Sequence, residues 1–140
     1  MKFARRQFLN MAAVAAALPA LSPAATHGQG TTIAANAAMI VERTHYFAKP
    51  GLATEVLDLR RKACAVRLSM GLPAGEIFIK HPRGDGSEPD VAWQCTFTDA
   101  TAREADLAAR AASTEFQNVV AQMLKQIVRF DRQVFSVATI

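Results

Sequence analysis

The sequence predicts an α+β domain in which helices cover one face of a four-stranded antiparallel sheet. Residues 91–97 alternate large apolar side chains with small or polar ones, which is typical of a strand with one buried face. Two longer segments, beginning near residues 52 and 100, repeat their apolar residues with the period of a helix. Turn-forming residues separate these segments. The elements therefore follow one another as strand, helix, strand, strand, helix, strand.

Charge and composition limit the partners. The 140 residues contain 16 Lys and Arg against 12 Asp and Glu, but Lys2, Arg5 and Arg6 belong to an amino-terminal segment unlike the rest. The remaining 13 basic residues nearly balance the 12 acidic ones, so nucleic acid is not an expected partner. The folded part is close to one hundred residues, which is enough for one modest core.

The first 25 residues have the layout of a secretory signal. A basic start precedes an apolar run from Met11 to Leu18 and then small residues, and this run is too short for a permanent membrane span. The Arg5–Arg6 pair, followed by a variable residue and then Phe8 and Leu9, resembles a twin-arginine signal, although Ala4 replaces the usual Ser or Thr. The alternatives are an ordinary secretory signal or a retained anchor.

The twin-arginine resemblance implies a bacterial protein that the translocation machinery exports already folded, to the periplasm or beyond. Cleavage near residues 24–25 would leave residues 26–38, rich in small and polar residues, as a flexible linker. The folded domain is expected over residues 39–140.

The first half of the domain pairs a strand with a helix. Residues 40–47 are rich in β-branched and aromatic residues and stop at a Lys-Pro-Gly turn over residues 49–51. The helix that follows ends at Gly71, just before Pro73. Its expected inward face consists of Leu52, Val56, Leu59, Ala63, Val66 and Met70.

The second half begins with a hairpin. Residues 76–81 and 91–97 are expected to be antiparallel strands joined by a long loop. Asp99 is a helix N-cap, and Ser113 resembles a fresh N-cap, so the second helical region is predicted to be bent or split. Residues 129–137 alternate again and form the fourth strand.

This order is that of the split βαβ, or ferredoxin-like, arrangement. The helices can cover only one face of the sheet. The other face must therefore be solvated, filled by a ligand or covered by a second copy, and a homodimer is the natural solution.

Over residues 39–138 the chain resembles the dimeric α+β barrel group, and within it NIPSNAP-type domains. The similarity rests on residues with matching spacing: Glu42, Tyr46, the Lys-Pro-Gly turn at 49–51, the strand ending at Phe97 to Asp99, and Ser113 to Gln117. The usual Asp-Pro pair is absent from the last of these. The resemblance implies two sheets facing each other around a lumen that can hold a small apolar or aromatic molecule.

Relatives on this scaffold include cofactor-independent oxygenases, haem-degrading or haem-using enzymes and proteins without a known reaction, so function depends on the site. His45 and His81 are the histidine candidates, since a histidine in a lumen can ligate haem iron or act as a base. The alternative is a histidine hydrogen-bonded or solvated at a sheet margin, and His45 is the stronger of the two. No cofactor is predicted, haem stays open, and no Cys-x-x-Cys-His is present for covalent attachment.

Tyr46, Trp93 and Gln94 are the ligand-binding candidates, because an oxygenase needs aromatic walls and a polar group for its substrate. Alternation places Trp93 and Gln94 on opposite faces. If helices cover the Trp93 face, Trp93 belongs to the core and Gln94 faces the lumen. Cys64 and Cys95 can meet as a disulfide or stay as buried thiols, and they are too few for a zinc site.

Three hypotheses follow. The first is an exported homodimer of NIPSNAP type that binds a small apolar or aromatic molecule, with catalysis not established. The second is an enzyme, either a cofactor-independent monooxygenase or a haem-linked oxidoreductase, with His45 as its candidate catalytic residue. The third is a structural partner of another exported enzyme.

Overall fold

The computed structural model describes residues 38–138, which form a four-stranded sheet and three helices. The predicted signal peptide and most of the predicted linker lie outside the described residues. The elements in chain order are β1 (Ile40–Ala48), α1 (Ala53–Ser69), β2 (Glu76–Ile79), β3 (Val91–Phe97), α2 (Ala100–Ala112), α3 (Thr114–Gln126) and β4 (Ile127–Ser136).

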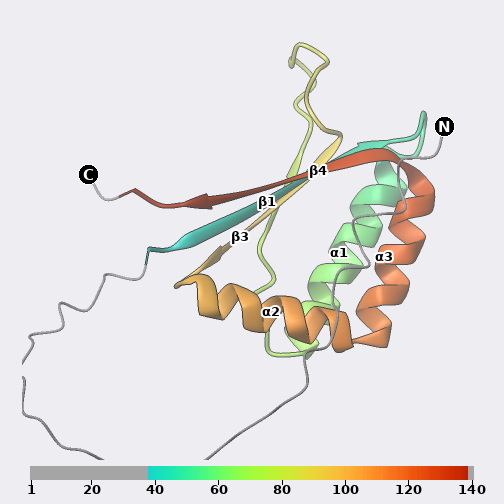
Figure 1. The fold of residues 1–140 in the computed structure, drawn as a ribbon. Coiled ribbons are helices and arrows are strands. Elements are labelled where there is room, and N and C mark those ends of the chain that lie inside the picture. The colour runs from blue at the N-terminus through green and yellow to red at the C-terminus, as the bar shows by residue number, and fades with distance from the viewer. Residues whose placement is uncertain (1–37, 139–140) are drawn as a thin grey trace, which may run out of the picture. The chain divides into compact units, whose positions relative to one another are not determined.

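The strand order in the sheet is β2-β3-β1-β4, and every neighbouring pair is antiparallel. The first strand is therefore central although it comes first in the chain. All three helices lie on one side of the sheet, and no helix of residues 38–138 covers the opposite face (Figure 1). This confirms the predicted α+β fold with one covered and one open sheet face.

Side-chain alternation along β1 separates the two faces. Glu42, Thr44 and Tyr46 are buried beneath the helices, whereas the residues between them are more exposed. In β3 the helix-facing side chains are those of Val91, Trp93, Cys95 and Phe97, all of them buried. These two rows, together with Val56, Met123 and Ile127, form the core between sheet and helices.

Two side-chain caps place the helices after β3. The Asp99 carboxylate accepts a hydrogen bond from the Ala102 amide at 2.7 Å and begins α2. The Ser113 hydroxyl accepts one from the Phe116 amide at 3.1 Å and begins α3. Because Ser113 has extended backbone angles, it ends one helix and starts the next, which confirms the predicted split.

Two strand boundaries differ from the sequence expectation by two residues. The second strand ends at Ile79 and not at residue 81, because the chain enters the loop before Pro82, whose ring cannot donate to a ladder. The fourth strand begins at Ile127, directly after α3, and not at residue 129. Here the Lys49 amide donates to the Gln126 carbonyl at 2.9 Å, which joins the end of the helix to the sheet.

Gly75 provides a sensitive test of the packing around Trp93. It has φ of +75°, and an added Cβ would meet Trp93 Nε1 and lie 2.5 Å from the Gln94 carbonyl oxygen. Gly71 has φ of +74° but no atom within 4 Å of the same added Cβ. We expect Gly71→Ala to cost roughly 1–2 kcal/mol of unfolding free energy from the backbone conformation alone. Gly75→Ala should cost about 1–3 kcal/mol more, because the core must shift. Urea unfolding of both variants measures the difference, and equal losses would contradict the packing argument.

Candidate functional site

The structure divides the sequence-predicted site residues between the two sides of the sheet. Tyr46 and Trp93 lie on the helix side and are buried, whereas His45 and Gln94 lie on the open face. His81 lies beyond β2 in the exposed loop, where its Nδ1 accepts a hydrogen bond from the Arg83 amide at 3.1 Å. The five candidates therefore do not form one site.

Trp93 is 1% exposed at the centre of the core. Its indole Nε1 donates to the Ala74 carbonyl at 2.8 Å, which satisfies its one polar group. The guanidinium carbons of Arg60 and Arg67 lie 4.5 and 4.8 Å from its ring centroid, within cation–π range. The ring therefore holds two positive charges of α1 against the sheet.

Tyr46 joins the same environment through its hydroxyl. Arg60 Nη1 donates to this oxygen at 3.2 Å, and Arg60 Nη2 lies 3.6 Å from Cys64 Sγ. The third nitrogen of this guanidinium, Nε, is buried and has no hydrogen-bond partner within residues 38–138, and the same holds for the hydroxyl of Thr44. Tyr46 is thus a buried contact of α1, although it comes directly after the open-face residue His45.

The open face carries a different set of groups. His45 lies opposite Ala92 on one side and opposite Asp131 on the other. The neighbouring cross-strand pair is polar, since Arg43 donates from Nε and Nη2 to Gln94 Oε1 at 3.0 and 2.5 Å. This leaves the Gln94 amide nitrogen able to donate to a ligand.

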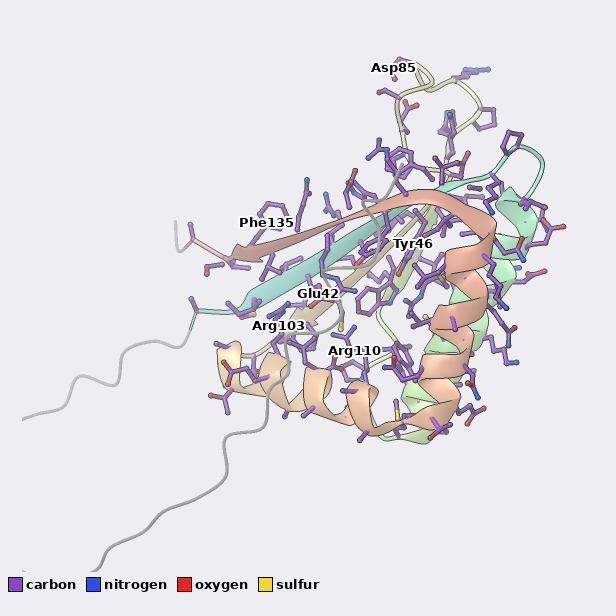
Figure 2. The ribbon with its side chains drawn as sticks, turned by 45° about the vertical axis from the view of Figure 1, so that its right-hand side comes forward. Glu42, Tyr46, Asp85, Arg103, Arg110 and Phe135 are labelled. Carbon is purple, nitrogen blue, oxygen red and sulfur yellow. The ribbon has the colours of Figure 1, made fainter. Side chains whose placement is uncertain are left out.

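A buried cluster of charges lies on the helix side between the sheet and α2, and it is the strongest polar feature of the described chain (Figure 2). Glu42 is 0% exposed and faces three guanidiniums. Its carboxylate lies 2.8 Å from Arg103 Nε, 3.4 Å from Arg110 Nη2 and 3.5 Å from Arg132 Nε. These cations come from α2 and β4, so the cluster connects helix and sheet.

Asp106 forms the second half of the cluster. Arg67 donates to both of its oxygens, at 2.6 and 3.1 Å, which is the fork geometry of a strong pair. Arg110 Nε lies 2.7 Å from Asp106 Oδ2, at an angle too bent for a hydrogen bond. Arg67 also donates to the Pro73 carbonyl at 2.7 Å, so it ties α1 to α2 and to the segment before β2.

The cluster holds more positive than negative charge. Two carboxylates, Glu42 and Asp106, face four guanidiniums, those of Arg67, Arg103, Arg110 and Arg132. Burial lowers the pKa of Arg110, and the nearby charges of Arg67 and Arg132 lower it further, while Glu42 and Asp106 oppose this shift. An anion beside the cluster would meet favourable electrostatics.

Sequence reasoning missed this cluster. The inward face expected for the helix from residue 52 contained no arginine, but Arg60 and Arg67 are buried on this helix, and Leu68 is exposed. Their spacing of seven places them on the same face as Val56 and Ala63. That spacing, and the Asp106–Arg110 pair four residues apart, were the available signals.

Both cysteines are buried free thiols. Cys64 Sγ donates to the Ala74 carbonyl at 3.2 Å, and Arg67 Nη2 lies 3.7 Å from Cys95 Sγ. Burial raises the pKa of the Cys95 thiol, and the Arg67 charge opposes this only in part. Cys95 is therefore a core group and not an activated nucleophile, and Cys64 is buried in the same core.

Residues 38–138 contain neither a metal-binding cluster nor a membrane-spanning helix. These residues contain no group of three or more His, Cys, Asp or Glu side chains arranged to hold a metal ion. No helix among them is both long and apolar enough to cross a bilayer.

Comparison with known proteins rests on structure, since no family model and no curated protein matches the sequence. A NIPSNAP family protein from Agrobacterium tumefaciens superposes with a TM-score of 0.56 at 17% identity, covering 73% of this chain and 88% of that one. An uncharacterised NIPSNAP-like domain protein from Burkholderia xenovorans superposes with a TM-score of 0.55 at 21% identity, covering 72% of this chain and 85% of that one. A third structure is that of a dimeric protein from Bacteroides fragilis, of unknown function and ferredoxin-like fold. It superposes with a TM-score of 0.55 at 10% identity, covering 71% of this chain and 96% of that one.

The fold is ferredoxin-like. A putative antibiotic biosynthesis monooxygenase from Bacteroides thetaiotaomicron has the same ferredoxin-like architecture, with a TM-score of 0.51 at 11% identity and coverage of 73% and 90%. At these identities the likeness establishes the ferredoxin-like fold, and the chemistry has to be argued from side chains.

Proposed function

We propose that this chain is an exported homodimer of NIPSNAP type that binds a small apolar or aromatic molecule between two facing sheets. One observation supports it most directly: the sheet face without helices carries exposed aromatic side chains on both edge strands. Phe78 of β2 and Phe135 of β4 are each nearly half exposed there. Figure 2 shows Phe135 on the side of β4 that faces away from the helices.

The inner strands provide the lining of the proposed lumen. Between the two edge strands lie His45 and Gln94, with the small Ala92 next to His45. Two copies packed through this face would remove Phe78 and Phe135 from water and enclose these central groups. The Bacteroides fragilis protein of the same fold is dimeric, which supports association of two copies.

A second candidate function is catalysis, and the position of His45 favours it. This side chain faces away from the helices, where it can reach a molecule in the proposed lumen as a base or as a haem ligand. The enzyme would be a cofactor-independent monooxygenase or a haem-linked oxidoreductase. Tyr46 and Trp93 would then act from the core, by holding the sheet beneath the lumen.

The test combines native mass spectrometry with an absorption spectrum of the protein recovered from the periplasm of a bacterial host. A dimer carrying an organic ligand supports the binding function, and a Soret band lost in His45→Ala supports the haem-linked one. Recovery from the cytoplasm alone would contradict export, and a monomer would contradict the lumen.

A charged substitution on the open face tests whether two copies associate there. We expect Phe135→Lys to shift the protein toward monomer, because a lysine ammonium would be buried against the second sheet. Leu68→Lys is the matched control, since Leu68 is even more exposed but lies on α1, away from the open face. Light scattering during size exclusion measures both, and a Phe135→Lys dimer of unchanged stability would contradict the proposed interface.

A further inference from the structure

A surface on the helix side of β4 is left uncovered beside the buried charge cluster. Arg132 and Val134 lie opposite Thr44 and Glu42 in register, so they face the same side as the helices. Yet Val134 is 46% exposed, and the Arg132 side chain is 35% exposed. The helices therefore leave this part of the strand open to solvent, directly next to Glu42.

The arginines at this surface have unused donors. Arg103 and Arg132 both approach Glu42 through Nε, at 2.8 and 3.5 Å. Within residues 38–138 their terminal guanidinium nitrogens make no hydrogen bond. Each guanidinium has five N–H donors in a planar fork, so both keep the pair of donors that matches an oxyanion.

Charge balance favours an anion at this surface. The four guanidiniums of the cluster exceed its two carboxylates by two charges, and Arg103 and Arg132 are its most exposed members. A single carboxylate held between Arg103 and Arg132 would lower this excess from two charges to one. The exposed Val134 next to it favours an anion with an apolar portion.

We propose that Arg103, Arg132 and Val134 form a binding site for an organic monocarboxylate. The two guanidiniums hold the carboxylate, and Val134 contacts the apolar part of the ligand. This carboxylate site lies on the opposite side of the sheet from His45 and Gln94. It is therefore independent of the lumen, and it can exist whether or not two copies associate.

Isothermal titration calorimetry of the full chain with benzoate tests the carboxylate site, with benzamide as a neutral probe of the same shape. We expect benzoate to bind and benzamide to bind at least about tenfold more weakly, since only the carboxylate pairs with both guanidiniums. Arg132→Gln should weaken benzoate binding by a similar factor. Arg129→Gln, on the same strand but the open face, should leave it unchanged.

Three results would overturn the site: equal binding of the two probes, unchanged benzoate binding in Arg132→Gln, or no benzoate binding at millimolar concentration. Far-UV circular dichroism checks that the variants fold. If Arg132→Gln does not fold, nitrogen-15 NMR of the unmodified chain decides the matter. Benzoate must then shift the Nε–H resonances of Arg103 and Arg132 and not that of Arg129, and any other pattern overturns the assignment.

Discussion

Glu42→Gln is expected to lower the free energy of unfolding by about 3–5 kcal/mol, a large part of the stability of a domain of this size. The substitution keeps the shape of the side chain but removes the charge that faces Arg103, Arg110 and Arg132. Arg110, which is largely buried, would then keep only Asp106 as a counter-charge. Urea unfolding followed by far-UV circular dichroism measures the loss.

Glu76→Gln is the matched control for this prediction. Glu76 lies on the edge strand β2, is exposed and makes no ion pair among the described residues. Its substitution should change the unfolding free energy by no more than about 0.5 kcal/mol. A loss below about 1 kcal/mol in Glu42→Gln would show that the guanidiniums do not depend on this carboxylate.

Arg67→Met should be comparably damaging, with a loss of about 3–5 kcal/mol, although methionine fills much of the same apolar volume. Asp106 would lose the hydrogen bonds that both of its oxygens accept from Arg67 and would keep Arg110 as its ion-pair partner, and the Pro73 carbonyl would lose its donor. Arg61→Met on the same helix is the control. Arg61 is exposed and pairs only with Asp58 in solvent, so its substitution should cost at most a few tenths of a kcal/mol.

A double variant distinguishes two causes of the stability lost in Arg67→Met, namely lost packing and a buried carboxylate without its partner. Arg67→Met combined with Asp106→Leu removes both members of the buried pair and should recover part of the stability lost by Arg67→Met alone. Thermal and urea unfolding of the four proteins complete the cycle. If the double variant is no more stable than Arg67→Met, the loss comes from packing around Trp93 and not from the Asp106 carboxylate left without Arg67.

Strands, helices and their order follow from local signals that the sequence displays. Alternation over residues 91–97 located β3, and Asp99 and Ser113 marked two helix starts through capping, which depends only on neighbouring residues. The same alternation placed Trp93 and Gln94 on opposite faces. The end of β2 was wrong by two residues, because loop entry depends on how the hairpin leaves the sheet.

The buried charge cluster could not be predicted in the same way. Its members come from β1, α1, α2 and β4, and a charged residue on an amphipathic helix is normally solvated. Burial of Arg67 becomes favourable only when Asp106, 39 residues away, meets it across the fold. The residue pattern of one helix therefore cannot reveal a charged partner that lies in another helix.

The two guanidiniums stacked on Trp93 give the protein a built-in optical probe. The chain contains a single tryptophan, so its fluorescence reports from one place, where α1 meets the sheet. Far-UV circular dichroism reports on all helices at once, including α2 at the charge cluster. If fluorescence and dichroism change at the same denaturant concentration, the charge cluster and the core unfold together. If the dichroism changes first, α2 detaches while the core around Trp93 is still folded.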